Sequence, residues 1–145
     1  MARRKTDFVV QDDTSRDNGK VFVLTEMPAA RSEKWAMRAL LALQRAGVEI
    51  PDDAVQNGMA GIATVGIDAL GKLNFHEVEY LLDEMFDCIQ IKPDPKLSAV
   101  RDLIDDDIEE VKTRILLRKE VLELHLGFTL AGNQSRSAPA RPSSE

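Results

Sequence analysis

The run Lys20-Val21-Phe22-Val23-Leu24-Thr25-Glu26-Met27-Pro28 carries the chain from one type of secondary structure to another. Its apolar centre is β-prone, and together with Phe8-Val9-Val10 it predicts a β-hairpin whose connection ends in Asp17-Asn18-Gly19. Pro28 then predicts the start of a helix, because its fixed φ suits a first helical turn. A two-stranded hairpin alone is marginal in water, so we expect it to lie against helices or to pair with the edge of another chain.

The residues after Pro28 predict a helix that stops near Gly47, where glycine can adopt the left-handed capping conformation. A small-residue segment, 52–73, is predicted to be helical as well, although each of its glycines lowers helix propensity by about 1 kcal/mol relative to alanine. Such small side chains would let a neighbouring helix approach closely. The buried stripe of the first helix is predicted to consist of Ala36, Ala39, Leu40 and Leu43.

The clearest helix prediction starts at Asn74, whose side chain can cap a helix, with Glu77 following three residues later. Apolar residues then recur at helical spacing as far as Ile89. The prolines of Lys92-Pro93-Asp94-Pro95 end this pattern and predict a loop that continues to about Leu103. The recurring apolar residues are Val78, Leu81, Leu82, Met85, Phe86 and Ile89.

A last helix is predicted from about Asp105 to Leu126, because acidic residues near its start and basic residues further on complement the helix dipole. Gly127 is expected to close it. A first set of apolar residues should dock one face on the protein: Ile108, Val111, Ile115 and Leu122. A second set widens that face: Leu117, Val121 and Leu124. This second set either forms an exposed patch that binds a partner or is buried within the domain.

Together these elements predict a mainly α fold with an N-terminal β-hairpin arm (1–26), a small helical domain (27–132) and a disordered tail (133–145). The hydrophobic fraction of 43% is enough for one core, and an aromatic fraction of only 5% suits packed helices better than a sheet sandwich. The tail has no large apolar residue, so it cannot offset the entropy of becoming ordered.

Composition narrows the classes of partner and compartment. The net charge of -6 opposes nucleic-acid binding, which depends on clustered Lys and Arg. Cys88 is the single cysteine, so an intramolecular disulfide is impossible and a reducing cytoplasm fits. We expect no membrane segment, since the apolar stretch Gly58 to Ile67 is far shorter than the ~20 residues a spanning helix needs.

Candidate chemistry is sparse in the sequence, so we predict no catalytic residue, no cofactor and no metal site. His76-Glu77 begins like a zinc-protease motif, but Tyr80 stands where the second histidine is required. Cys88 lacks a nearby base, and the acidic residues Asp105 to Asp107 fit a solvated helix start better than a cation site. Trp35 is predicted to be either a core residue or an exposed anchor for a partner.

The order of these elements and the amino-acid sequences of three runs resemble those of the tail assembly chaperones of long-tailed bacteriophages. The resemblance covers residues 20–130. The runs are Lys20-Val21-Phe22-Val23-Leu24-Thr25-Glu26-Met27-Pro28, Glu33-Lys34-Trp35-Ala36-Met37-Arg38-Ala39-Leu40-Leu41, and Asp105-Asp106-Asp107-Ile108-Glu109-Glu110-Val111 through Leu124-His125.

The resemblance implies a non-enzymatic protein of the host cytoplasm that binds the tape measure protein, helps recruit tail tube subunits, and is absent from the mature virion. A homo-oligomer is possible. The candidate partner-binding residues are Leu117, Val121, Leu124 and Trp35. Two other classes share the size and helicity: a minor structural tail or connector protein, and a small phage protein that binds a host factor.

Overall fold

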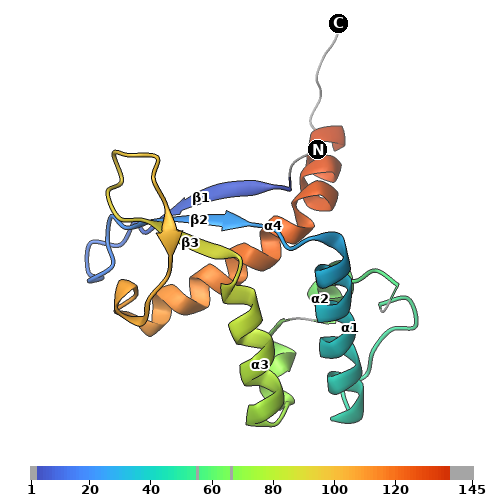
Figure 1. The fold of residues 1–145 in the computed structure, drawn as a ribbon. Coiled ribbons are helices and arrows are strands. Elements are labelled where there is room, and N and C mark those ends of the chain that lie inside the picture. The colour runs from blue at the N-terminus through green and yellow to red at the C-terminus, as the bar shows by residue number, and fades with distance from the viewer. Residues whose placement is uncertain (1–2, 55, 66, 138–145) are drawn as a thin grey trace, which may run out of the picture.

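The computed structural model describes residues 3–54, 56–65 and 67–137. A four-stranded antiparallel sheet with the strand order β1-β2-β3-β4 packs against helices, as Figure 1 shows. The strands are β1 (Lys5–Val9), β2 (Val21–Thr25), β3 (Ile89–Lys92) and β4 (Arg101–Asp102). The helices are α1 (Ala29–Arg45), α2 (Met59–Val65), α3 (Phe75–Phe86) and α4 (Val111–Ser137), with the short 3-10 helices η1 (Ile67–Lys72) and η2 (Asp105–Asp107).

The prediction of a mainly α fold is wrong, because the hairpin belongs to a sheet that continues into the middle of the chain. β2 pairs with β3, which places Phe22 opposite Ile91 and Leu24 opposite Ile89. The sequence pattern predicts a helix that continues to Ile89, but α3 ends at Phe86. The next residues instead alternate between buried and half-buried, which is the period of a strand, so the chain has a mixed α/β fold.

β2 is the central buried strand of this sheet. Phe22 and Leu24 face the main hydrophobic core, whereas Val21 and Val23 are buried on the opposite face. On that opposite face, Lys92 lies opposite Val21 and Asp7 lies opposite Val23. The Lys92 Nζ is 3.0 Å from the Asp7 carboxylate, so this ion pair joins the two neighbours of β2 across its valines.

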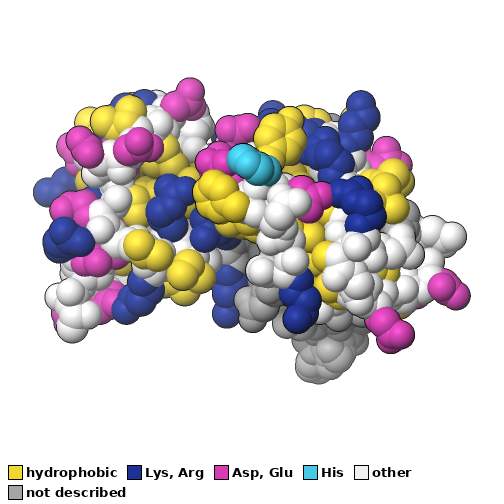
Figure 2. Space-filling view, turned by 90° about the horizontal axis from the view of Figure 1, so that it is seen from below, with side chains coloured by type: hydrophobic (Ala, Val, Ile, Leu, Met, Phe, Trp, Pro, Cys, Tyr) yellow, Lys and Arg dark blue, Asp and Glu magenta, His cyan; other side chains and the backbone are white. Residues whose placement is uncertain are grey.

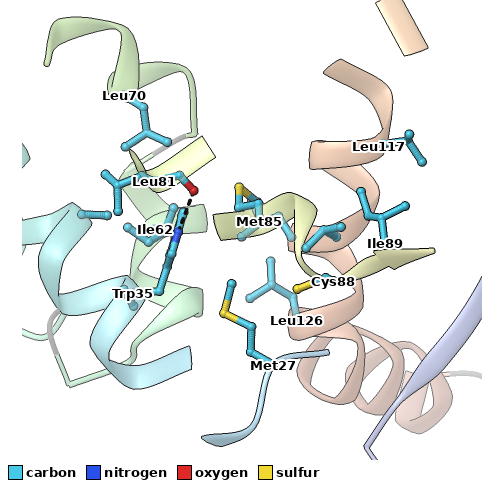
Figure 3. Close-up of a cluster of buried hydrophobic side chains, with 14 of the residues drawn as sticks. Met27, Trp35, Ile62, Leu70, Leu81, Met85, Cys88, Ile89, Leu117 and Leu126 are labelled. Atoms are coloured by element: carbon cyan, nitrogen blue, oxygen red, sulfur yellow. Dashed lines mark hydrogen bonds between the residues drawn. The ribbon is translucent and has the colours of Figure 1, made fainter. Parts of the chain in front are cut away.

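Helices α1 and α3 follow the sequence prediction closely. Gly47 has a φ of 91°, as expected for a residue that terminates a helix, and the predicted stripe of α1 is buried. The Asn74 side chain accepts a hydrogen bond from the Glu77 N–H at 3.0 Å, which confirms the predicted cap. Trp35 joins the two helices, since its indole N–H donates to the Leu81 carbonyl at 2.9 Å (Figure 3).

The small-residue segment 52–73 is a turn followed by α2 and η1 rather than one helix. Gly61 is needed for a close approach, because a Cβ there would lie only 2.1 Å from the Ala54 carbonyl oxygen. The neighbour that requires a small residue at this glycine is therefore a turn of the backbone, while α2 as a whole packs against α1 and α4.

α4 differs from its prediction at both ends and in its orientation. It begins at Val111, after η2, and continues past Gly127 to Ser137. The helix therefore overlaps the first residues of the predicted tail, and the rest of that tail, 138–145, lies outside the described residues. Both apolar sets are divided differently from the prediction: Leu117 and Val121 are fully buried, and Leu122 is buried with them, while 72% of Val111 is exposed.

The start of α4 is held by Asp17, which comes from the connection between β1 and β2. The Asp17 carboxylate is fully buried and accepts hydrogen bonds from the backbone N–H groups of Glu109 and Glu110, at 2.9 and 3.0 Å. Lys20 Nζ lies 2.9 Å from the same carboxylate and donates to the Asp107 carbonyl at 2.8 Å. Asp17 therefore caps the start of α4, although it lies far away in the sequence, where a helix is usually capped by a side chain next to its first turn.

These contacts set the protonation state of Asp17. Burial alone would raise the pKa of this carboxyl, but the hydrogen bonds from Thr113, Glu109, Lys20 and Glu110 outweigh burial and lower its pKa from 3.8 to about 2. The ionised form is therefore the one that the fold stabilises.

We expect Asp17→Asn to lower the free energy of unfolding at pH 7 by about 2 kcal/mol, because the amide has no charge and one oxygen for these donors. The folded pKa of Asp17 lies below the unfolded value of 3.8, so its stabilisation is present above pH 4 and is lost as the pH falls towards 2. Urea unfolding of both proteins from pH 7 to pH 2 measures the two effects.

Asp13→Asn, in the same connection but exposed, is the matched control and should unfold like the wild type. Equal stability of Asp17→Asn and the wild type at pH 7 would show that the contact with α4 is not needed.

Candidate functional site

An open, mainly apolar groove of about 440 Å³ lies between α1 and α3. Leu41 on α1 and Tyr80 on α3 line it, and they are 43% and 64% exposed. Figure 2 views the molecule from below, at the free ends of these two helices, and shows hydrophobic side chains among charged ones on this face. The remaining lining residues are Arg38, Ala42, Arg45, His76, Glu77 and Leu81.

Ion pairs connect α1 to α3 along this groove. Arg31, Arg38 and Arg45 are seven residues apart, close to two helical turns, so they lie on one face of α1. Arg45 pairs with Glu77, and Arg38 pairs with Glu84. Arg31 is 2.9 Å from the same Glu84 carboxylate. The pairing of the end of α1 with the start of α3 also shows that the two helices run in opposite directions.

These pairs make the groove apolar rather than cationic. Arg38 and Arg45 line it, yet both guanidinium groups already face carboxylates of α3. The guanidinium carbon of Arg38 also lies 5.5 Å from the centre of the Tyr80 ring, which is cation–π geometry. The groove therefore suits an apolar side chain better than a charged ligand.

The sequence-predicted partner-binding residues lie elsewhere. Trp35 and Leu117 are fully buried (Figure 3). Val121 is also fully buried, and Leu124 is half-buried against the same core. The described fold therefore agrees with the alternative that the second apolar set of α4 is buried within the domain. Partner binding through these side chains would require the core to open.

In the part of α4 whose side chains the structure describes, 111–126, Val111, Ile115 and Leu116 form an exposed apolar set. Two of them belong to the face that was expected to dock on the protein. Sequence reasoning also missed Leu41 and Tyr80. The available signal was the seven-residue spacing of the α1 arginines, which matches the spacing of Glu77 and Glu84 on α3.

Cys88 is poorly suited to nucleophilic chemistry in this fold. It is buried, and burial raises the pKa of its thiol to about 11, so the thiolate is scarce at neutral pH. Within residues 3–54, 56–65 and 67–137, no three His, Cys, Asp or Glu side chains form a group that could hold a metal ion. The helices in this part of the chain also include none that is long and apolar enough to cross a membrane.

No family model matches the chain, and neither the curated proteins nor the solved structures include a match to it.

His125 lies on α4 and connects this helix to the segment that joins β2 to α1. Its Nε2 accepts a hydrogen bond from the Met27 N–H at 2.8 Å, and its Nδ1 lies 2.8 Å from the Val121 carbonyl oxygen. This arrangement requires a neutral ring that carries its proton on Nδ1. Burial lowers the pKa of His125, and this effect outweighs the hydrogen bond to Val121, which favours the protonated form.

We expect the stability of the wild type to fall as the pH decreases from about 6.5 to 5, because the unfolded state takes up a proton on His125 that the folded state resists. His125→Gln should flatten this dependence, since its amide oxygen can accept from Met27 without titrating. Urea midpoints at intervals between pH 7.5 and 5 measure the slope.

His76→Gln, on the exposed surface of α3, is the control and should leave the slope unchanged. A slope that survives in His125→Gln would mean that another group causes it.

Proposed function

We propose that this protein is a non-enzymatic tail assembly chaperone that holds an apolar helical segment of the tape measure protein in the groove between α1 and α3. The single observation that carries the proposal is this groove, in which Leu41 and Tyr80 remain exposed beside a completed core. The resemblance to tail assembly chaperones supplies the identity of the client.

A helix laid in a groove is recognised through apolar side chains one turn apart, and it buries them between two helices of the receptor. The α1–α3 groove offers such a setting, because its apolar residues come from two antiparallel helices and its arginines are already neutralised. A tape measure segment rich in apolar residues would lose its contact with water there. Binding in the groove would in this way keep the tape measure segment soluble.

A chaperone that brings tail tube subunits to the tape measure protein needs a second surface. Val111, Ile115 and Leu116 on α4 supply an exposed apolar set on an element that does not line the groove. The stretch from Val111 to Lys119 also contains four basic residues and no acidic one, although the whole chain is acidic. We assign this surface to the tail tube subunit, with the host cytoplasm as the place of action and no copy in the mature virion.

We expect the double variant Leu41→Ser, Tyr80→Ser to weaken client binding about tenfold, because both changes remove apolar contact area from the groove. The free energy of unfolding should change by less than about 1 kcal/mol, since both side chains are exposed. Coexpression with the tape measure protein, followed by measurement of the soluble client, gives the binding readout.

The matched control is Leu97→Ser, Val100→Ser, which removes two exposed apolar residues from the connection between β3 and β4. It should keep the client soluble. If the groove variant does so equally well, the client does not occupy the groove, and finding the chain in purified virions would instead identify a structural tail protein.

A further inference from the structure

β1 is an edge strand with an open side. Among the described strands it pairs with β2, and Figure 1 shows it along the upper margin of the sheet. The Val10 N–H donates to the Lys20 carbonyl, and the Glu26 N–H donates to the Arg4 carbonyl. Because hydrogen-bonded and non-bonded pairs alternate in an antiparallel ladder, the even-numbered residues of β1 direct their backbone groups towards β2.

The odd-numbered residues Lys5, Asp7 and Val9 therefore direct their N–H and C=O groups away from the sheet. All three side chains are exposed and share one face of β1. The strand itself is anchored, because Phe8 on the other face lies opposite Phe22 and packs against the core. β1 is thus a fixed strand that presents a row of backbone donors and acceptors.

We propose that two copies of the chain associate through antiparallel pairing of β1 with β1, in the register that places Lys5 of each copy opposite Asp7 of the other. This association uses no residue of the groove and does not depend on client binding. It joins the two four-stranded sheets into one continuous sheet.

Charge selects this register from the possible ones. Only odd-numbered residues can form the new hydrogen-bonded pairs, so the register changes in steps of two residues. One neighbouring register sets Lys5 opposite Lys5, and the other sets Asp7 opposite Asp7, where like charges repel. The intermediate register forms two Lys5–Asp7 pairs, with Thr6 facing Thr6 on the two-fold axis.

The Asp7 carboxylate has room for this second cation. Lys92 approaches its Oδ2 atom at 3.0 Å, which leaves the Oδ1 atom for Lys5 of the other copy. Lys92 also holds Asp7 near the edge of the sheet before association occurs. The strand is therefore complementary to itself in both backbone hydrogen bonding and side-chain charge, which an unrelated extended segment would match only by chance.

Sedimentation velocity over a range of concentrations tests the pairing, and we expect a monomer–dimer equilibrium. Lys5→Asp and Asp7→Lys should each weaken it at least about tenfold, because each replaces two attractive cross-strand pairs by repulsive ones. Combining both changes in one chain reverses the pairs and should restore the dimer.

An equimolar mixture of the two single variants provides the sharpest readout. One variant carries two carboxylates at these positions and the other carries two ammonium groups, so the mixture should form a heterodimer that neither forms alone. Lys34→Asp and Glu79→Lys make the same charge changes on exposed helix positions and should leave the dimer intact. Circular dichroism confirms that each variant is folded.

Amide hydrogen exchange locates the surface. The amides of Lys5, Asp7 and Val9 should gain protection as the concentration rises, whereas that of Thr6 is already bonded to β2. The proposal is overturned if the wild type stays monomeric up to about 300 μM. It is also overturned if the mixture of single variants contains no heterodimer, or if these three amides remain unprotected in a dimer.

Discussion

The buried Asp17 carboxylate is the contact on which the position of α4 depends. Both of its oxygens are used, by the N–H groups of Glu109 and Glu110 and by Lys20, so the connection between β1 and β2 cannot move without leaving a buried charge unpaired. The rotation of α4 that this contact fixes turns Leu117 and Val121 towards the sheet. The core under β2 is complete only in that arrangement.

Local signals in the sequence predicted α1 and α3, because the residues that begin and end these helices lie within or beside them. The failures concern distant partners. Ile89 lies one helical turn after Met85, so its position fits a continued helix as well as the start of a strand. Only its pairing with β2 favours the strand. α4 is apolar around much of its circumference, so its own sequence does not predict which side packs against the sheet and is held by Asp17. The groove was missed for the same reason, since it exists only when α1 and α3 lie antiparallel.

The net charge of -6 does not reveal that many of the charged side chains form ion pairs within the protein. Cations join separate elements: Arg38 to Glu84, Arg16 to Glu110, and Arg101 to Asp107 with two contacts of 2.8 Å. Arg38 is the one of these that lines the groove between α1 and α3, and its internal pair leaves the groove with apolar area rather than free charge. At the edge of the sheet, Lys5 and Asp7 place opposite charges on one exposed face of β1.

The position of β2 has a consequence for synthesis on the ribosome. β2 leaves the exit tunnel early, but β3 can pair with it only after all of α1, α2 and α3 have followed, and α4 covers the core later still. During that interval the nascent chain carries Val21 to Leu24 as a bare apolar strand beside an unfinished sheet, a typical aggregation hazard. Translation that stops before Val111 would release such a chain permanently. The half-made protein therefore exposes an apolar strand that the finished fold buries.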